Sequence, residues 1–337
     1  MYPFNNSTSK TRVAFFPLTG RTSMKLLVVC LVAASVAVAL SVRVDSKDSK
    51  AAITVQAAGR GGQGLNLRDG REMRVEYRGD QFSSEALQSG AARARAVASV
   101  DLDDNGTPDL VAGYASNGGG IVTIQRGNND AFAPTDDSIF PRIQAGYNPD
   151  SLSSIAEIYQ VPEPADFVLA GDFNQDAVKD VLVAARGGGA YLLAGDGAGG
   201  FAELQKIALP GAVTAVAAAE FGMSDGKADL AVGISGTDGP SLLVFPSVEG
   251  GLSAPVSFPL KGEATAIQFG NLDRDPFLDI AVAAGSEIEI IHGWGLKNFA
   301  DVQSRVERID VPNTLRGLAL GNFIWDRDGR TKAPAVN

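Results

Sequence analysis

Acidic and amide side chains occupy alternate positions in the stretch from Ser99 to Gly113, SVDLDDNGTPDLVAG. A hard divalent cation such as Ca²⁺ takes roughly six to eight oxygen ligands at about 2.4 Å, and alternate residues of a tight loop can direct oxygens toward one centre. Gly106 permits the sharp turn that such a loop needs. The spacing therefore predicts a Ca²⁺ site. Its expected ligands are the side chains of Asp101, Asp103 and Asn105, the backbone carbonyl of Thr107, and the Asp109 carboxylate, which would bind through both oxygens.

The same spacing recurs in GDFNQDAVKDVLVAA (171–185) and GNLDRDPFLDIAVAA (270–284), and degenerate copies occur at Glu220–Asp229 and Asn322–Lys332. We number these five acidic loops in chain order. Ala177 stands in the second loop where the first has Gly106, and we expect it to be strained. Occupancy of the degenerate third and fifth loops stays open. The predicted ligands are Asp172, Asn174, Asp176, the Val178 carbonyl and Asp180 in the second loop, and Asn271, Asp273, Asp275, the Phe277 carbonyl and Asp279 in the fourth.

The acidic loops allow two other interpretations. An EF-hand closes at its twelfth position with glutamate and continues as a helix, whereas these loops close at the ninth position and enter strand-like sequence such as Leu110-Val111. The other possibility is that the loops are Asx-rich turns that hold no metal.

Residues that could carry catalysis are scarce. His292 is the only histidine; it lies at the end of a β-like run, beside Trp294, where a structural role is expected. There is no HExxH motif and no phosphate-binding Gly-Lys-Ser/Thr loop, and the single cysteine, Cys30, lies in an N-terminal apolar segment. A glycosidase with paired carboxylates stays open among so many acids. Most patterned carboxylates are already assigned to the loops, so the sequence predicts a non-catalytic protein.

The acidic loops belong to a repeat of about fifty residues. The fifth positions of successive loops are separated by 71, 49, 50 and 53 residues. We interpret the long first interval as an insertion, an extended loop between repeats at residues 131–164. In each unit a strand-like approach, the loop, an apolar run, a glycine turn and a second β-like run follow one another. The units then carry a hydrophobic anchor and a last strand, the anchors being Phe132, Phe201, Leu252 and Phe299.

Four short strands per unit are typical of a propeller blade, because radial repetition leaves only short sheet edges. The sequence therefore predicts an all-β fold, a β-propeller of four-stranded blades, with at least four blades and the start of a fifth. The chain stops at Asn337, where the next strand of that blade is expected. We expect a truncated fragment of a larger ring; a smaller or open ring is the alternative.

From Arg93 to the C-terminus the repeated Asp/Asn-x-Asp/Asn-x-Asp/Asn-Gly-x-x-Asp pattern resembles the FG-GAP (VCBS) repeats of integrin α-chain propellers and many secreted bacterial proteins. The resemblance implies calcium in the loops and a ring that is usually seven-bladed. It also implies recognition, because some members of the family are adhesion receptors or lectins.

The N-terminal region has the pattern of a secretory signal. The uncharged run LLVVCLVAASVAVALSV (26–42) follows a basic segment, and Met24 is a natural start. We assign residues 1–57 to a signal peptide with a basic n-region; an uncleaved membrane anchor is the alternative. Residues 58–84 are interpreted as a linker and leading strand, and residues 85–337 as the propeller repeats.

Charge and localisation limit the partners. Beyond Arg43 the chain carries 24 basic and 39 acidic residues, which argues against nucleic acid. We expect a secreted or cell-surface protein that binds an extracellular protein or glycan and meets the membrane only through its signal or anchor. The long segment 131–164 is the one most free to bind. The alternative function is an accessory propeller on a larger secreted enzyme whose catalytic part lies beyond Asn337.

Overall fold

The computed structural model describes residues 73–135, 137–202, 204–221, 228–273, 275–293, 306–321 and 333–335, together with two short upstream strands. The chain divides into two compact units, Met1–Glu72 and Met73–Asn337. In the first unit the described strands are β1 (Thr54–Val55) and β2 (Leu65–Asn66), which pair antiparallel. Apart from β1, the predicted signal segment lies outside the described residues, as does the fifth acidic loop. Within the described part, no helix has the length and apolar character needed to span a membrane.

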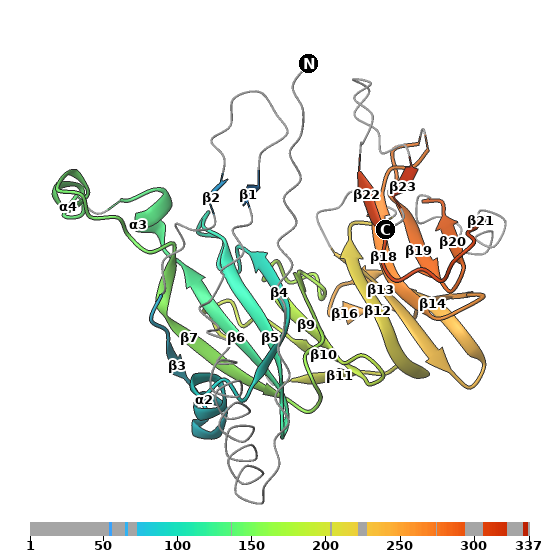
Figure 1. Cartoon of the computed structure of the whole chain (residues 1–337), viewed down its shortest axis with the longest axis horizontal. Helices are drawn as coiled ribbons and strands as arrows, with labels where there is room; N and C mark the ends of the chain where they lie inside the picture. Colours follow the sequence, from blue (N-terminus) through green and yellow to red (C-terminus); the bar gives the residue numbers. More distant parts are fainter. Residues whose placement is uncertain are drawn as a thin grey trace, which may run out of the picture. The chain divides into compact units, whose positions relative to one another are not determined.

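The unit from Met73 onward consists of successive four-stranded antiparallel sheets, in which strands adjacent in the chain are also adjacent in the sheet (Figure 1). The first sheet carries an additional edge strand, β3 (Glu76–Arg78), parallel to β7. A small hairpin of β15 (Ser247–Val248) and β16 (Gly251–Leu252) sits inside the third repeat. The sheets are β4 (Arg93–Val100), β5 (Asp109–Ser116), β6 (Gly119–Gly127) and β7 (Leu152–Val161); β8 (Phe167–Gly171), β9 (Asp180–Ala184), β10 (Ala190–Leu193) and β11 (Gln205–Ile207); β12 (Gly211–Ala219), β13 (Asp229–Gly236), β14 (Gly239–Phe245) and β17 (Val256–Pro259); and β18 (Ala264–Gly270), β19 (Asp279–Ala284), β20 (Glu287–Ile291) and β21 (Val306–Asp310).

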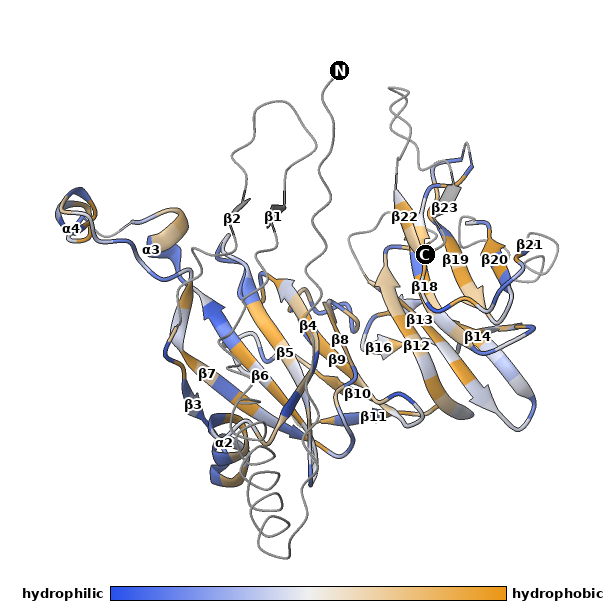
Figure 2. Ribbon diagram, in the orientation of Figure 1, coloured by the Kyte–Doolittle hydropathy of each residue, from blue (hydrophilic) through white to orange (hydrophobic). Residues whose placement is uncertain are grey.

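In the second, third and fourth sheets, the second strand is apolar at nearly every position because both of its faces are covered. In β9, Val181 and Val183 belong to a hydrophobic cluster shared with the first sheet. Leu182 and Ala184 point the other way and belong to a cluster shared with the third sheet. Side chains alternate across a strand, so a strand between two packed sheets needs apolar residues on both faces. Figure 2 shows these apolar strands in the middle of the sheets.

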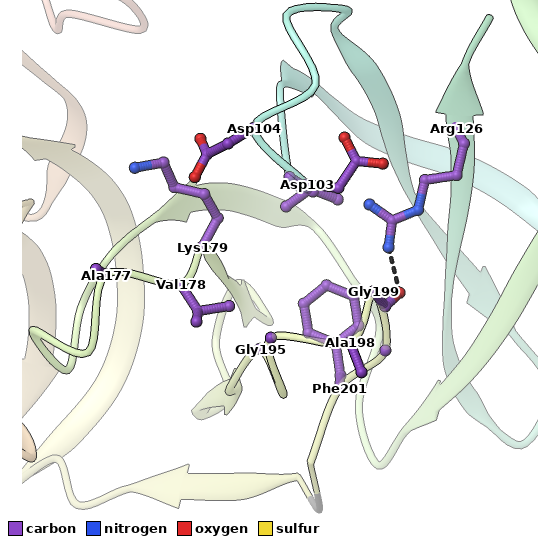
Figure 3. A pocket seen from close by; sticks show the side chains of 13 residues that line it. Asp103, Asp104, Arg126, Ala177, Val178, Lys179, Gly195, Ala198, Gly199 and Phe201 are labelled. Carbon is purple, nitrogen blue, oxygen red and sulfur yellow. Dashed lines mark hydrogen bonds between the residues drawn. The ribbon is translucent and has the colours of Figure 1, made fainter.

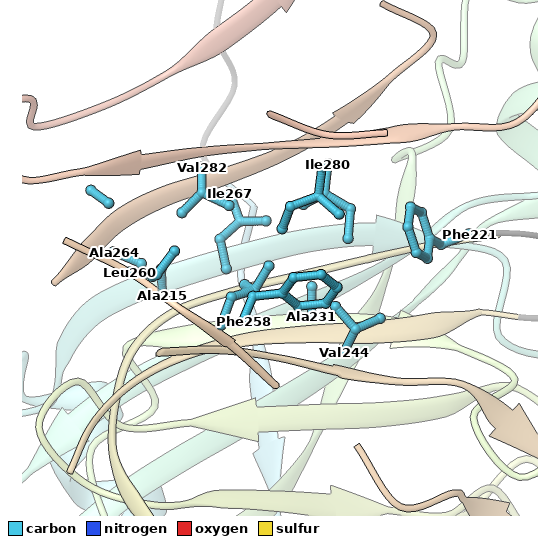
Figure 4. Close-up of a cluster of buried hydrophobic side chains, with 13 residues drawn as sticks. Ala215, Phe221, Ala231, Val244, Phe258, Leu260, Ala264, Ile267, Ile280 and Val282 are labelled. Carbon is cyan, nitrogen blue, oxygen red and sulfur yellow. The ribbon is translucent and has the colours of Figure 1, made fainter. Parts of the chain in front are cut away.

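The cluster between the third and fourth sheets shows how neighbouring sheets interlock. Phe258 and Val244 of the third sheet pack against Ile280 and Ile267 of the fourth (Figure 4). Close approach also requires a small residue at Gly233, where an added Cβ would lie 2.6 Å from the Ala264 Cβ. Contact at this distance leaves no room for a side chain.

The predicted fold class is confirmed. Four four-stranded sheets follow one another, and each packs face to face on the next, which is the arrangement of propeller blades. β22 (Ala319–Gly321) and β23 (Ala333–Ala335) form a further pair, and Leu320 packs on the outer face of the fourth sheet. We refer to the sheets as blades one to four.

The prediction that residues 131–164 form an extended loop between repeats is wrong, because part of this segment is a strand of blade one. Its last part is β7, the outer strand of blade one, and the preceding segment holds α3 (Asn129–Phe132) and α4 (Phe140–Gln144). The inserted segment is therefore residues 128–151, and it lies within a blade, between β6 and β7. The strand was missed because an outer strand mixes apolar and polar residues.

Two further differences concern single elements. Phe132, predicted as an anchor, is 57% exposed because α3 leads away from the sheet, whereas Phe201 and Leu252 do pack against blade cores. A helix, α2 (Gln81–Gln88), precedes β4, so the predicted start of the repeats at residue 85 falls inside it. Asp80 caps this helix by accepting a hydrogen bond from the Ser83 amide.

Candidate metal-binding loops and the adjoining pocket

The last aspartate of each of the first four acidic loops makes the same two backbone contacts in its blade. In blade one, Asp109 Oδ2 accepts a hydrogen bond from the Leu102 amide at 3.0 Å, and Oδ1 accepts one from the Gly127 amide at 2.7 Å. We call these residues the closing aspartates. The equivalent amide donors are Phe173 and Gly195 for Asp180, Phe221 and Ser247 for Asp229, and Leu272 and Gly293 for Asp279.

Each closing aspartate ties three parts of its blade together. It begins the second strand, while its partners lie in the loop after the first strand and at the end of the third. Asp109, Asp180 and Asp279 are at most 1% exposed. Buried backbone amides need acceptors, and a carboxylate is a strong one. The closing aspartates therefore have a structural role that the metal-ligand prediction did not include.

A sequence signal for this role existed. The third acidic loop has Met223 at a ligand position but keeps Asp229 at the closing position. Asp229 makes both backbone contacts, each at 2.9 Å. Retention of the aspartate where the ligand pattern is lost indicates a function independent of metal.

The third and fifth positions of the first, second and fourth loops form consecutive Asx turns. In the first loop, Asp103 accepts a hydrogen bond from the Asn105 amide at 3.3 Å, and Asn105 accepts one from the Thr107 amide at 2.8 Å. Such bonds hold the loop without a cation. They use one oxygen of each side chain. The same pairs in the other two loops are Asn174 with Asp176, Asp176 with Val178, Asp273 with Asp275, and Asp275 with Phe277.

The first two loops share an unusual backbone. Their fourth residues, Asp104 and Gln175, have φ of 52° and 61°, and their sixth residues, Gly106 and Ala177, have φ of 86° and 68°. The predicted strain at Ala177 is confirmed, because a left-handed conformation is unfavourable for a residue with a Cβ. The fourth loop has Pro276 at its sixth position, and a proline ring cannot adopt positive φ.

The donor set of the second loop fits a Ca²⁺ ion. Asp172 Oδ2 accepts a hydrogen bond from the Ala177 amide, whereas Oδ1 is buried and has no hydrogen-bond partner. Asp172 is only 6% exposed. A buried carboxylate oxygen without a partner is costly, and a cation bound there would remove that cost.

The first and fourth loops differ from the second. In the first, the two oxygens of Asp101 accept hydrogen bonds from the amides of Asn105 and Gly106 at 3.0 and 2.8 Å, which leaves further acceptor capacity on each oxygen. In the fourth, the Asn271 amide nitrogen donates to the carbonyl of Asp275 at 2.6 Å and, more weakly, to that of Phe277 at 3.4 Å. A donor group therefore faces the Phe277 carbonyl that was predicted to be a ligand.

A pocket of about 360 Å³ lies where the first and second loops meet the turn after β10. Asp103 and Asp104 come from the first loop, and Lys179 comes from the second. Figure 3 shows these charged groups on one side of the pocket and the Phe201 ring on the other. The other lining residues are Leu102, Arg126, Ala177, Val178, Gly195, Gly197, Ala198, Gly199 and Gly200.

Arg126 connects the two blades at this pocket. Its Nη1 donates to Asp109 Oδ2 at 2.9 Å, and its Nη2 donates to the Gly199 carbonyl. The glycine-rich turn is held by Asp196, whose Oδ1 accepts hydrogen bonds from the amides of Ala198 and Gly200. The turn thus connects the antiparallel strands β10 and β11, and it forms one wall of the pocket.

No model of a known protein family and no curated protein matches this sequence. Solved structures similar to it include two of BBS1N in complex with ARL6DN, from crystals soaked with lead and with mercury. They match with 14% and 16% identity and TM-scores of 0.44 and 0.43, over 82% and 71% of this chain. The chain spans 65% and 56% of those two chains.

Proposed function

We propose that this chain is a secreted or cell-surface, non-catalytic β-propeller of the FG-GAP (VCBS) type. In this proposal the first and second acidic loops bind Ca²⁺, and the pocket between them binds an extracellular glycan. The observation that carries the proposal is the position of the pocket, because two candidate calcium loops form its walls.

Calcium binding is supported by the chemistry of the loops. Both bring together several carboxylates, and the unpaired, buried Asp172 Oδ1 needs a positive partner. Because Asp103 is both a predicted ligand and a pocket residue, Ca²⁺ in the first loop would also fix one pocket wall. Ligand binding in the pocket should therefore depend on Ca²⁺.

A glycan fits the pocket better than an apolar ligand. Asp103 and Asp104 can accept hydrogen bonds from sugar hydroxyls, and Lys179 can donate to them. The partly buried Phe201 ring, held edge-on against Tyr159 at 5.3 Å between centroids, offers an apolar surface for the face of a sugar ring. The volume lies within the range of small-ligand sites, roughly 300 to 1,000 Å³.

A glycan array probed with the full chain, in Ca²⁺ and in EDTA, tests the proposal. We expect retention of a glycan in Ca²⁺ and loss of that signal in EDTA. Lys179→Ala should weaken binding, whereas Lys206→Ala, on β11 and outside the pocket, should not. Absence of binding to every glycan, or equal binding by the two lysine variants, would contradict the pocket assignment and favour a protein partner.

A further inference from the structure

The fourth acidic loop faces a histidine at a position that holds a different residue in the other blades. His292 directly precedes Gly293, the amide donor to Asp279, just as Arg126 directly precedes Gly127 in blade one. Arg126 makes a 2.9 Å ion pair with Asp109. His292 thus brings an imidazole to the place where blade one has a guanidinium.

The His292 ring lies among three carboxylates. Its Nδ1 is 3.4 Å from Asp273 Oδ2 and 3.3 Å from Asp279 Oδ1. This nitrogen is buried and has no partner in hydrogen-bond geometry. On the other side of the ring, Nε2 is 3.5 Å from Glu307 Oε2. The Glu307 carboxylate thus faces Nε2 without a hydrogen bond, and a small rotation of its side chain would let it accept the Nε2 proton and leave the Nδ1 lone pair free.

We propose that Asp273, Asp279 and His292 form a site for a divalent transition metal of the Zn²⁺ class. Donor atoms of these three residues all lie within 4.8 Å of one another. Zn²⁺ binds imidazole nitrogen and carboxylate oxygen at about 2.0 to 2.2 Å, so neighbouring donors of a tetrahedral site are separated by roughly 3.3 to 3.5 Å. The two distances from Nδ1 match that separation.

The surroundings also favour a transition metal over Ca²⁺ here. Ca²⁺ takes oxygen ligands, whereas imidazole suits zinc and its neighbours. Pro276 prevents the backbone conformation of the first two loops. The side-chain nitrogen of Asn271 donates to the Asp275 carbonyl, so a hydrogen-bond donor lies among the oxygens that would coordinate Ca²⁺. Glu307 would orient the ring, as carboxylates commonly do for metal-bound histidines. Asp273 is 36% exposed, so an ion can enter.

This inference goes beyond the proposed glycan-binding function and does not depend on it. The competing explanation is that His292 is a cationic partner of the two aspartates, as Arg126 is for Asp109. That explanation predicts no preference for transition metals.

The single histidine makes a direct test possible without mutation. The full chain is labelled with ¹⁵N-histidine, freed of metal with EDTA and dialysed, and titrated with Zn²⁺. We expect one pair of ring nitrogen signals, of which Nδ1 shifts and saturates at one equivalent of Zn²⁺, whereas millimolar Ca²⁺ alone leaves it in place. Ring signals that do not move with Zn²⁺, or that respond equally to Ca²⁺, would overturn the proposal.

Variants separate this site from the calcium loops. Glu307→Gln should weaken Zn²⁺ binding by roughly 10- to 100-fold, because it removes the carboxylate that orients the ring. Glu249→Gln, at an exposed site on another blade, is the matched control. His292→Gln should abolish Zn²⁺ binding but leave Ca²⁺ binding by the first two loops unchanged in calorimetry. Loss of Zn²⁺ binding would therefore count against the His292 site alone, and loss of Ca²⁺ binding against the calcium loops alone. Equal Zn²⁺ affinity in both glutamate variants would contradict the role of Glu307.

Discussion

The Asp109 carboxylate accepts a 2.7 Å hydrogen bond from the Gly127 amide, and the equivalent bond recurs in every blade at 2.8 or 2.9 Å. Residues distant in the chain are thus joined at the same place in each repeat. The bond is present in blade three, whose acidic loop is degenerate. The closing aspartate is therefore a feature of the blade, and Ca²⁺ binding is a property added to some of the loops.

Replacing a closing aspartate should strongly destabilise the fold. Asp180→Ala leaves two backbone amides, those of Phe173 and Gly195, without their acceptor in a buried site. We expect the free energy of unfolding to fall by about 2 to 5 kcal/mol, measured by urea denaturation in EDTA. Asp238→Ala, in the exposed turn between β13 and β14, should change it by less than about 0.5 kcal/mol. Similar small losses in both variants would contradict the structural role.

Relieving the strain at Ala177 should stabilise the protein. Ala177→Gly removes a Cβ from a residue with φ of 68°, and we expect a gain of about 1 kcal/mol in the free energy of unfolding. Ala198 lies in the nearby turn and does not have positive φ. Ala198→Gly should therefore be neutral or destabilising, because glycine adds chain entropy to the unfolded state. Destabilisation of both variants to the same degree would argue against strain at Ala177.

Much of the fold could be predicted because two sequence features, the acidic loop and the apolar run that follows it, recur together about every fifty residues. The apolar runs that became β9, β13 and β19 are buried on both faces, so their composition identifies them without tertiary information. In β5 the same kind of run alternates between buried and half-buried residues. β7 was missed because one edge of an outer strand pairs with only the short β3, and its sequence, LSSIAEIYQV, mixes polar and apolar residues. Outer strands need less hydrophobicity, so their sequence signal is weaker.

The candidate sites were harder to predict than the fold. Spacing identified the loop carboxylates but not the direction of each oxygen, so the backbone contacts of Asp109 were not foreseen. The pocket at Asp103 and Lys179 depends on packing between blades, which no local motif encodes. The position of His292 beside Asp273 likewise depends on the register of β19 and β20, which brings the segment before β19 next to the segment after β20.

Ca²⁺ affinity should decrease in mild acid. Burial raises the pKa of the Asp180 carboxyl, the hydrogen bonds from Gly195 and Phe173 oppose this, and the neighbouring carboxylates of the same loop raise it again. Without metal, this carboxyl binds its proton more tightly in the folded than in the unfolded protein. This difference stabilises the folded protein. The stabilisation is present in full below the pKa of the carboxyl in the unfolded protein, about 4, and is lost as pH rises through its pKa in the folded protein.

Ca²⁺ needs the ionised carboxylate and must displace that proton. We therefore expect calorimetry to show weaker Ca²⁺ binding and greater proton release at about pH 5 than at about pH 7. An affinity that stays constant over this range would show that Asp180 is ionised throughout and would contradict the expectation.

Thermal unfolding of the full chain in millimolar Ca²⁺ and in EDTA tests most directly whether the acidic loops bind calcium. An ion that binds only the folded state at 100 times its Kd stabilises by about 2.7 kcal/mol per site. For a protein of this size we expect the midpoint to rise by roughly 5 to 10 °C. Asp172→Asn should reduce the rise, whereas Asp238→Asn should preserve it. Equal midpoints in Ca²⁺ and EDTA would contradict calcium binding and leave the loops as Asx turns.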